Sequence, residues 1–339
     1  MNTNLNFDLL AVASIVAMLF ASVAMGQLAP DRLYYGIDRR IAMSASAPGQ
    51  ADGTPAEIRL YEPVSMEGVP AAEPVETAAI ELGRVDLAGL FPRLWQAPAS
   101  SVGVLYAQLA VAGEEVGPPV VLQPLVTPSR AVLKNRQTSE VGWPPVPKSY
   151  AGLRAYVDRH VVLETSAGEI EVRLRPDQAP NTSWNFRHLV EGGFYTDIVF
   201  HRIIEARPGR EPFVIQVGDP TARGDGGPGY QFDLERTALP HDFGVLSMAR
   251  SGDPDSNGSQ VFLCLSRGGT SFLDGRYTSF GQSVRGADPI VDVSLTPVDE
   301  RDRPTGDRPP KILSARLVDA PPYSRTPPPV TRPTAGADR

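Results

Sequence analysis

The chain has 339 residues, enough for two domains of ordinary size or one large one, and its 42% hydrophobic and 21% charged residues exclude wholesale disorder. A net charge of −7 at pH 7 argues against a general nucleic-acid binder, because phosphate binding depends on clustered cations. A single cysteine, Cys264, excludes an internal disulfide framework and any zinc site built from several thiolates, and with only four histidines we expect no metal and no cofactor.

The first 26 residues are expected to target the chain to a membrane. Asp8 is the one charged residue among the first 30, and residues 9–26 are apolar or small throughout. Small residues at Ser22, Ala24 and Gly26 suit a signal peptidase, whereas the lack of Lys or Arg before the apolar run argues against cleavage. Because the first basic residues follow this segment, an uncleaved anchor would favour a cytoplasmic C-terminal part. We favour export to the periplasm or another extracytoplasmic space, with the segment either cleaved or kept as a membrane tether.

A linker is predicted at residues 27–57, where the composition turns to Ala, Ser, Gly and Pro. Residues 58–130 are predicted to be β-rich, and within them residues 102–111 and 120–126 are typical of a hairpin. Frequent prolines favour edge strands and turns over a central parallel sheet. We therefore expect a small β-sandwich-like accessory domain, and we find no catalytic constellation in it.

A connector is predicted at residues 131–155, followed by a second domain at residues 156–319. Residues 161–165 and 170–174 are typical of two strands joined by a tight turn, and Pro180 is placed to open a helix. Many short strands, one or two helices and abundant turns indicate a closed or nearly closed antiparallel barrel.

The end of the chain changes character after a last predicted strand at residues 312–318. Six of the twenty residues at 320–339 are proline. This composition predicts a Pro-rich disordered tail.

Six strings of the second domain resemble the cyclophilin family of peptidyl-prolyl cis-trans isomerases, in a bacterial-like form, over about residues 157–319. They are Ala-Pro-Asn-Thr (179–182) with Asn-Phe (185–186), Phe-His-Arg-Ile-Ile (200–204), Phe-Val-Ile-Gln-Val-Gly-Asp-Pro (213–220), Gly-Val-Leu-Ser-Met-Ala-Arg (244–250), Asn-Gly-Ser-Gln-Val-Phe-Leu (257–263) and Phe-Leu-Asp-Gly-Arg-Tyr-Thr-Ser-Phe-Gly (272–281). The resemblance implies a mainly β fold, an eight-stranded antiparallel barrel capped by two helices.

The chemistry of proline isomerisation sets its own requirements on a site. Rotation about an X–Pro bond crosses a barrier of about 18–20 kcal/mol set by amide resonance, and no covalent bond breaks. A catalyst needs an apolar pocket for the proline ring, groups that fix the flanking backbone, and a donor to the nitrogen lone pair that appears only in the transition state. Arginine suits the last task because it stays protonated and presents a rigid fork of donors.

By resemblance, Arg202 is that donor, and Gln216 hydrogen-bonds the substrate backbone and positions the arginine. The residues that match the pocket for the proline ring are Phe213, Val214, Phe262 and Leu273. Those that match the groove for the residue before proline are Ala249, Arg250 and Gln260, where we expect backbone contacts to dominate at the first two. Those that match the rim are Phe272 and Tyr277.

Three departures from the family pattern stand close to these residues. Residues 205–212 are longer than the usual turn and are expected to affect access or substrate choice. Val217 replaces a glycine, which is expected to restrict the backbone beside Gln216. Phe272 replaces a tryptophan and removes an indole donor, so the resemblance implies weak binding of cyclosporin.

The expected substrates are X–Pro bonds in unfolded or flexible polypeptides, with a role in folding outside the cytoplasm. His201 and His241 are expected to be structural, because this isomerisation transfers no obligatory proton. The glycine-rich residues 223–229 are expected to form a family loop and not a phosphate cradle. Two alternatives stay open: a proline-binding chaperone or scaffold with little turnover, and a purely structural barrel with function in residues 58–128.

Overall fold

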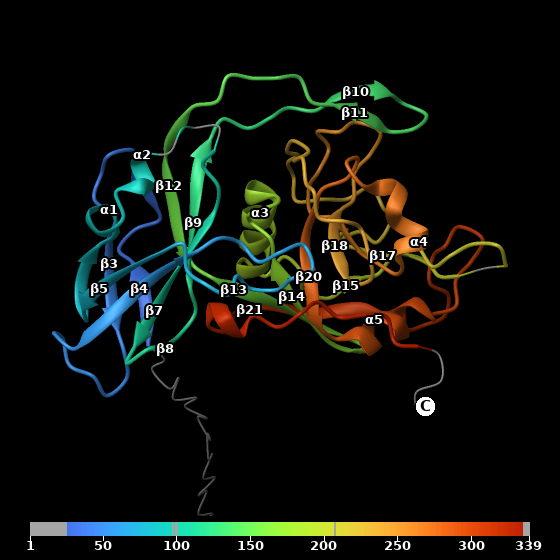
Figure 1. Cartoon of the computed structure of the whole chain (residues 1–339). Helices are drawn as coiled ribbons and strands as arrows, with labels where there is room; N and C mark the ends of the chain where they lie inside the picture. Colours follow the sequence, from blue (N-terminus) through green and yellow to red (C-terminus); the bar gives the residue numbers. More distant parts are fainter. Residues whose placement is uncertain (1–25, 97, 99–100, 207, 335–339) are drawn as a thin grey trace, which may run out of the picture.

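The computed structural model describes residues 26–96, 98, 101–206 and 208–334 (Figure 1). The expected membrane-targeting segment therefore lies, apart from Gly26, outside the described residues. Among the residues that are described, no helix is long and apolar enough to cross a membrane.

Two antiparallel sheets make up the N-terminal half of the described chain. The smaller sheet has the order β1-β3-β6, from β1 (Gln27–Pro30), β3 (Ala42–Ser46) and β6 (Gly83–Asp86). The larger sheet has the order β2-β12-β9-β7-β4-β5, with β8 paired to β7, from β2 (Tyr34–Gly36), β4 (Pro55–Tyr61), β5 (Glu76–Glu81), β7 (Leu105–Val111), β8 (Glu114–Glu115), β9 (Val120–Val126) and β12 (Tyr150–Val157). Two short helices, α1 (Leu87–Leu90) and α2 (Arg93–Gln96), follow β6. The β-rich N-terminal region and its β7–β9 pairing are confirmed.

The linker prediction for residues 27–57 is wrong. This stretch supplies β1, β2, β3 and the start of β4, and its apolar residues Leu28, Tyr35 and Ile41 are 0% exposed in the N-terminal core. Residues of both sheets share this core, and small side chains such as Ala45 are buried in it. The composition that suggested a linker instead reflects short strands packed face to face.

The connector prediction for residues 131–155 is also wrong. Its last part belongs to β12, which lies between β2 and β9 in the larger sheet, with Leu153 and Ala155 buried. Its first part forms a separate two-stranded hairpin, β10 (Val132–Asn135) and β11 (Glu140–Gly142). Figure 1 shows this hairpin reaching from the N-terminal sheet across one end of the C-terminal domain.

The C-terminal domain is built on a curled antiparallel sheet that has nine strands in the described part of the chain. Its order is β15-β21-β13-β14-β20-β18-β19-β17-β16, from β13 (Arg159–Thr165), β14 (Gly168–Leu174), β15 (Ile198–Val199), β16 (Arg202–Ile204), β17 (Val214–Val217), β18 (Val245–Met248), β19 (Val261–Cys264), β20 (Ser279–Arg285) and β21 (Lys311–Asp319). The mainly β fold and the predicted β13–β14 hairpin are confirmed.

The two ends of this sheet come close together. β15 and β16 lie at opposite ends of the strand order, yet only Phe200 and His201 separate them in sequence. Three Cα–Cα steps reach about 11 Å at most, so the sheet must curl round until its margins are neighbours. The count exceeds the expected eight strands because the chain forms a short strand on each side of this link.

Helices pack against the curled sheet and close its core. α3 (Pro180–Glu191) starts at Pro180 as predicted and buries Phe186 and Val190. The second expected helix is α5 (Ala287–Ser294), which buries Ile290. Shorter turns are α4 (Arg267–Thr270), the 3-10 helix η1 (Ser271–Leu273) and η2 (Tyr323–Arg325).

The disordered-tail prediction is wrong for residues 320–334. Tyr323 is 2% exposed and stacks on Tyr61 of β4 with ring centroids 4.2 Å apart. Farther along, the backbone N–H of Val330 donates to Ser283 O at 2.9 Å in the C-terminal domain. We call residues 320–334 the C-terminal strap, because they contact both domains. Residues 335–339 lie outside the described ranges.

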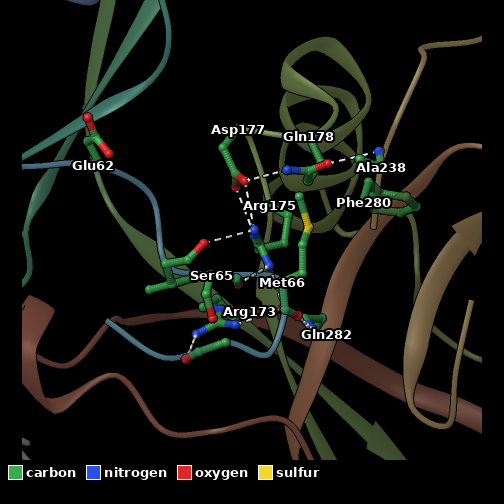
Figure 2. A network of polar contacts seen from close by, with 12 residues as sticks. Glu62, Ser65, Met66, Arg173, Arg175, Asp177, Gln178, Ala238, Phe280 and Gln282 are labelled. Atoms are coloured by element: carbon green, nitrogen blue, oxygen red, sulfur yellow. Dashed lines mark hydrogen bonds and ion pairs between the residues drawn. The ribbon is translucent and has the colours of Figure 1, made fainter. Parts of the chain in front are cut away.

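A buried arginine joins the two domains. Arg175 is 1% exposed, and its Nε and Nη2 donate to the two carboxylate oxygens of Asp177 at 2.9 and 2.7 Å. Its Nη1 donates to Gln282 Oε1 at 2.7 Å and to the Ser65 carbonyl, at 3.2 Å, in the loop between β4 and β5. Gln282 Nε2 donates in turn to the Met66 carbonyl at 3.1 Å. Figure 2 shows this loop lying beside the arginine. The N-terminal domain therefore contacts β20, the strand that contains Gln282, directly.

Candidate active site

Arg202, Gln216 and Phe262 lie in one row across three neighbouring strands. Arg202 in β16 pairs with Gln216 in β17, and Gln216 pairs with Phe262 in β19. The adjacent Ile203 and Ile215 are 1% and 0% exposed in the interior core. Because side chains alternate between the two faces of a strand, the row of three faces outward from the curled sheet.

A chain of side-chain amides fixes the middle of this row. Gln216 Nε2 donates to Gln260 Oε1 at 2.9 Å, and Gln260 Nε2 donates to the Gly226 carbonyl at 2.9 Å. Arg202 Nη1 reaches Gln216 Oε1 at 3.4 Å, beyond the usual hydrogen-bond range. Arg202 is exposed, so Gln216 orients its side chain without fixing it in one position.

The residues predicted to hold a proline ring lie together in one apolar cluster on this outer face. Val214, Phe262 and Leu273 are 2%, 5% and 3% exposed. Phe213, Ala249 and Tyr277 are partly buried and pack against them. Phe262 of this cluster is the cross-strand neighbour of Gln216, so the row that contains the cation at position 202 ends in an apolar cluster, as proline isomerisation requires.

The two aromatic residues predicted for the rim lie beside this cluster. Phe272 is 55% exposed and stacks on Phe213, with ring centroids 5.6 Å apart. Tyr277 meets Phe262 edge to face at 6.1 Å, and the Arg250 guanidinium lies 4.6 Å from the centre of the Tyr277 ring. The rim therefore offers flat apolar surfaces with one cation beside them.

Gln216 also lines a groove of about 740 Å³. This groove brings together the three residues predicted to accept the residue before proline: Ala249, Arg250 and Gln260. Its other wall is the glycine-rich loop, whose Gly226 carbonyl holds Gln260. The structure thus gathers the residues predicted for the proline ring in one cluster and those predicted for the residue before proline in one groove, and Ala249 belongs to both.

The backbone donors of the glycine-rich loop are occupied by the carboxylate of Asp219. Asp219 accepts hydrogen bonds from the backbone N–H groups of Thr221 at 2.7 Å, Gly224 at 2.5 Å and Gly226 at 3.0 Å. Burial alone would raise the pKa of Asp219, but these backbone donors outweigh it and lower the pKa to about 2. Donors that a phosphate would need are thus already in use, in line with a structural loop.

A buried histidine packs against Phe262 of the apolar cluster. His241 is 0% exposed, its Nδ1 lies 2.9 Å from Asp274 Oδ1, and its Nε2 lies 2.9 Å from Ser247 Oγ. Its ring stacks under Phe262 at 6.1 Å. Ser247 is also 0% exposed, so a substrate cannot reach this arrangement of serine, histidine and aspartate. The arrangement instead holds the ring of Phe262 in position. Burial lowers the pKa of His241.

His201, the other histidine named as a candidate acid or base, is buried as well. It is 6% exposed, and burial lowers the pKa of its ring. Both histidines are therefore neutral near pH 7. His241 is hydrogen-bonded as expected of a structural residue, whereas neither ring nitrogen of His201 has a hydrogen-bond partner among the described residues.

The departures near Arg202 have separate structural consequences. The inserted residues 205–212 connect β16 to β17, and Arg332 of the C-terminal strap donates to Glu205 Oε1 at 2.9 Å at the start of this loop. Val217 is 2% exposed in the interior core, and its backbone does not adopt a positive φ. The position that requires glycine is the next one, Gly218, where φ is +100° and a Cβ atom would lie 2.3 Å from Ser259 O.

Sequence reasoning missed several members of the apolar cluster. Val245 and Cys264 pack behind Val214 and could have been found from strand alternation around Ser247 and Phe262. Met66 comes from the N-terminal loop between β4 and β5, and no local pattern signals its contact with this cluster. Among the described residues no group of three or more His, Cys, Asp or Glu side chains could hold a metal ion.

Comparison with known proteins points to one family. A family model described as cyclophilin type peptidyl-prolyl cis-trans isomerase/CLD matches residues 160–317. The chain is 41% identical over 165 residues to peptidyl-prolyl cis-trans isomerase-like 1 of Emericella nidulans, covering 47% of this chain and 95% of the relative. The protein of the same name in Neurospora crassa is 41% identical over 163 residues, covering 47% of this chain and 93% of the relative.

A solved structure is also similar to the C-terminal domain. It is a cyclophilin type peptidyl-prolyl cis-trans isomerase of Cryptosporidium parvum, crystallised in the presence of the dipeptide Ala-Pro. The identity is 32%, the TM-score is 0.42, and the match covers 47% of this chain and 98% of that chain. The family model leaves the N-terminal domain and the β10–β11 hairpin outside its matched residues.

Proposed function

The chain belongs to the cyclophilin-type peptidyl-prolyl cis-trans isomerase family, and from this premise we propose that it isomerises X–Pro bonds of unfolded or flexible polypeptides outside the cytoplasm. X–Pro isomerisation without a catalyst takes tens to hundreds of seconds at 25 °C, which is slow enough to limit folding. An enzyme that acts on exposed segments would therefore assist slow folding of its clients.

The proposed mechanism uses the groups of the outward row in turn. The apolar cluster around Phe262 receives the proline ring, and the guanidinium of Arg202 donates to the prolyl nitrogen as the amide twists and its lone pair localises. Gln216 binds the substrate backbone and keeps the arginine near that nitrogen. The observation that carries the proposal is the placement of Arg202, Gln216 and Phe262 in one cross-strand row that ends in the apolar cluster.

The size of the arginine's contribution follows from its chemistry. A hydrogen bond from a charged group contributes roughly 1.5–3 kcal/mol, which corresponds to about a 10- to 150-fold change in rate. Arg202→Ala should lower kcat/KM of the full chain by this factor in a protease-coupled proline-isomerisation assay. Arg202→Lys should retain part of the activity, because it keeps the charge and loses the planar fork. The matched control is Arg316→Ala on β21, an exposed arginine paired with Glu169, which should leave kcat/KM unchanged.

The same assay separates the alternative functions. Peptide binding with little turnover, unaffected by Arg202→Ala, would favour a proline-binding chaperone or scaffold. If the chain shows neither peptide binding nor turnover, the function would be assigned to the N-terminal domain. An Arg202→Ala enzyme as active as the Arg316→Ala control would refute the proposed mechanism.

Location and inhibitor binding belong to the same proposal. Cell fractionation with N-terminal sequencing tests the extracytoplasmic location and decides between a cleaved and a retained segment at residues 1–26. Cyclosporin should bind weakly, because Phe272 lacks the indole donor. The bacterial-like character of the domain stays a prediction.

A further inference from the structure

Arg332, near the end of the C-terminal strap, bridges the ends of two strands of the candidate site. Its Nη1 donates to the Leu265 carbonyl at 2.9 Å, and its Nη2 donates to Glu205 Oε1 at 2.9 Å. Leu265 directly follows β19, and Glu205 directly follows β16, the strand that carries Arg202. One guanidinium therefore ties together the ends of β16 and β19, which lie on either side of β17 in the sheet.

Phe213 is held between the same two strand ends. Its backbone N–H donates to the Ile204 carbonyl at 2.9 Å, and its carbonyl accepts from the Leu265 N–H at 2.9 Å. The side chain of Phe213 stacks on Phe272 and packs against the apolar cluster around Phe262. A change in the spacing of these strand ends would therefore displace an aromatic ring that is predicted to contact the substrate proline.

The inserted residues 205–212, which connect β16 to β17, are fastened at both ends. At the end of the insertion, Ser266 Oγ donates to the Pro212 carbonyl at 2.7 Å. At its start, Glu205 Oε1 accepts from Arg332, while Glu205 Oε2 is buried without a hydrogen-bond partner among the described residues. The strap thus holds the start of a loop that is longer than the family pattern.

The strap is attached at points that do not need Arg332. Tyr323 is 2% exposed against the N-terminal domain, and the backbone N–H of Val330 donates to Ser283 O at 2.9 Å. A Cβ atom added to Gly244 would lie 2.9 Å from Val330 Cγ2, so the strap lies directly on the C-terminal domain there. A substitution of Arg332 therefore removes the bridge and leaves the strap in place.

We propose that Arg332 is a positioning residue of the isomerase, whose bridge holds Phe213 where the substrate proline binds. The inference rests on the proposed function, which gives the apolar cluster to the proline ring. Arg332 lies outside residues 160–317, the part of the chain that the family model matches. An apolar contact with proline is made in the ground state and in the transition state alike, so losing the bridge weakens peptide binding and leaves the rate at saturation unchanged.

Peptide affinity and turnover are measured separately on the full chain. An NMR titration with succinyl-Ala-Ala-Pro-Phe p-nitroanilide gives Kd, and exchange between its cis and trans signals at saturation gives kcat. Substitutions that act through a network of contacts change a coupling by a factor of about 2 to 30, so Arg332→Ala should raise Kd by about that factor and leave kcat unchanged. Arg332→Lys should raise Kd less, because it keeps the charge but loses the planar fork that spans both acceptors.

Two further variants test the route from the strap to the substrate. Arg325→Ala is the matched control, because it removes another cation of the strap, 63% exposed beside Glu114, and should keep the wild-type Kd. If Arg332 acts through Phe213, Arg332→Ala should raise Kd in the wild-type background but not in a Phe213→Ala background. Thermal unfolding checks that each variant folds, and Arg332→Lys carries the test if Arg332→Ala does not fold.

The outcomes separate this inference from the proposed function. Turnover with equal Kd for Arg332→Ala and Arg325→Ala overturns the inference and leaves the isomerase intact. A lower kcat with unchanged Kd, or the same increase in Kd when Phe213 is already alanine, shows that Arg332 does not act through Phe213 and also overturns it. Weaker binding by Arg332→Ala in a chain without turnover supports the inference and refutes the proposed catalysis. A chain that neither binds nor isomerises the peptide overturns both.

Discussion

Replacing Asp177 with asparagine removes the carboxylate that neutralises Arg175 at the domain junction. The side chains of Arg175 and Asp177 are 1% and 5% exposed, and two hydrogen bonds of 2.9 and 2.7 Å join them. The substitution keeps the volume and one acceptor oxygen, but it leaves a buried guanidinium without its anion. The same guanidinium holds the loop carbonyl of Ser65, so its repacking would loosen the contact between the domains.

The expected cost follows from this burial. Breaking a buried ion pair by removing one partner costs about 3–5 kcal/mol, and the remaining amide oxygen places Asp177→Asn near the lower value. A loss of 1 kcal/mol lowers Tm by about 2–4 °C in a unit of 150–250 residues, the size of the C-terminal domain, which predicts a decrease of about 6–12 °C in the unfolding transition of that domain. Thermal unfolding followed by circular dichroism and calorimetry measures this decrease.

An exposed ion pair of the same chemistry is the control. Glu114 lies 3.4 Å from Arg325, with side chains 79% and 63% exposed. Glu114→Gln should cost at most about 1 kcal/mol and change Tm by no more than about 4 °C. Equal Tm values for Asp177→Asn and Glu114→Gln would refute the view that the buried pair fastens the two domains.

Three other changes give separate tests. Tyr323→Phe removes the hydroxyl that donates to Glu62 O at 2.5 Å, and it should lower the free energy of unfolding by about 1–3 kcal/mol in urea titrations; an unchanged midpoint would mean that the C-terminal strap is not a structural element. Phe272→Trp should tighten cyclosporin binding in a fluorescence titration, and unchanged affinity would contradict the importance of the indole donor at the rim. The pKa of His241 is lowered in the folded state by burial, so the unfolded chain binds more protons below about pH 6.5 and stability should fall as the pH drops through that range. His241→Asn should flatten this part of the stability curve, and an undiminished slope would assign it to His201 and other groups.

Local sequence patterns were sufficient to predict much of the secondary structure of the C-terminal domain. The β13–β14 hairpin, the start of α3 at Pro180 and the last strand are set by alternation, proline and glycine within a few residues. The site residues could be named for a similar reason. Once Arg202, Gln216 and Phe262 are placed on strands, alternation puts them on one face, and the sheet register brings them together.

Predictions from composition were wrong where contacts with residues distant in sequence determine the structure. Residues 27–57 and the end of the predicted connector contain many small residues and prolines, yet they pair with strands far away in sequence, as Leu153 pairs with Tyr35. Tyr323 stands among prolines, and its order depends on Tyr61, about 260 residues earlier. Such contacts leave no periodic signal in the segment itself. For the same reason the contact between Arg332 and Glu205 could not be read from the sequence.

The C-terminal strap has a consequence for the order in which a newly synthesised chain matures. The N-terminal core can bury most of its strands early, but Gln108 meets Tyr323 only after another 215 residues have been made, and Tyr61 waits for the same residue. A chain stalled or clipped before Tyr323 would expose the face of Tyr61 and leave the side-chain oxygen of Gln108 without this donor at the boundary of the first domain. Such a shortened product would carry an exposed mark of its incompleteness.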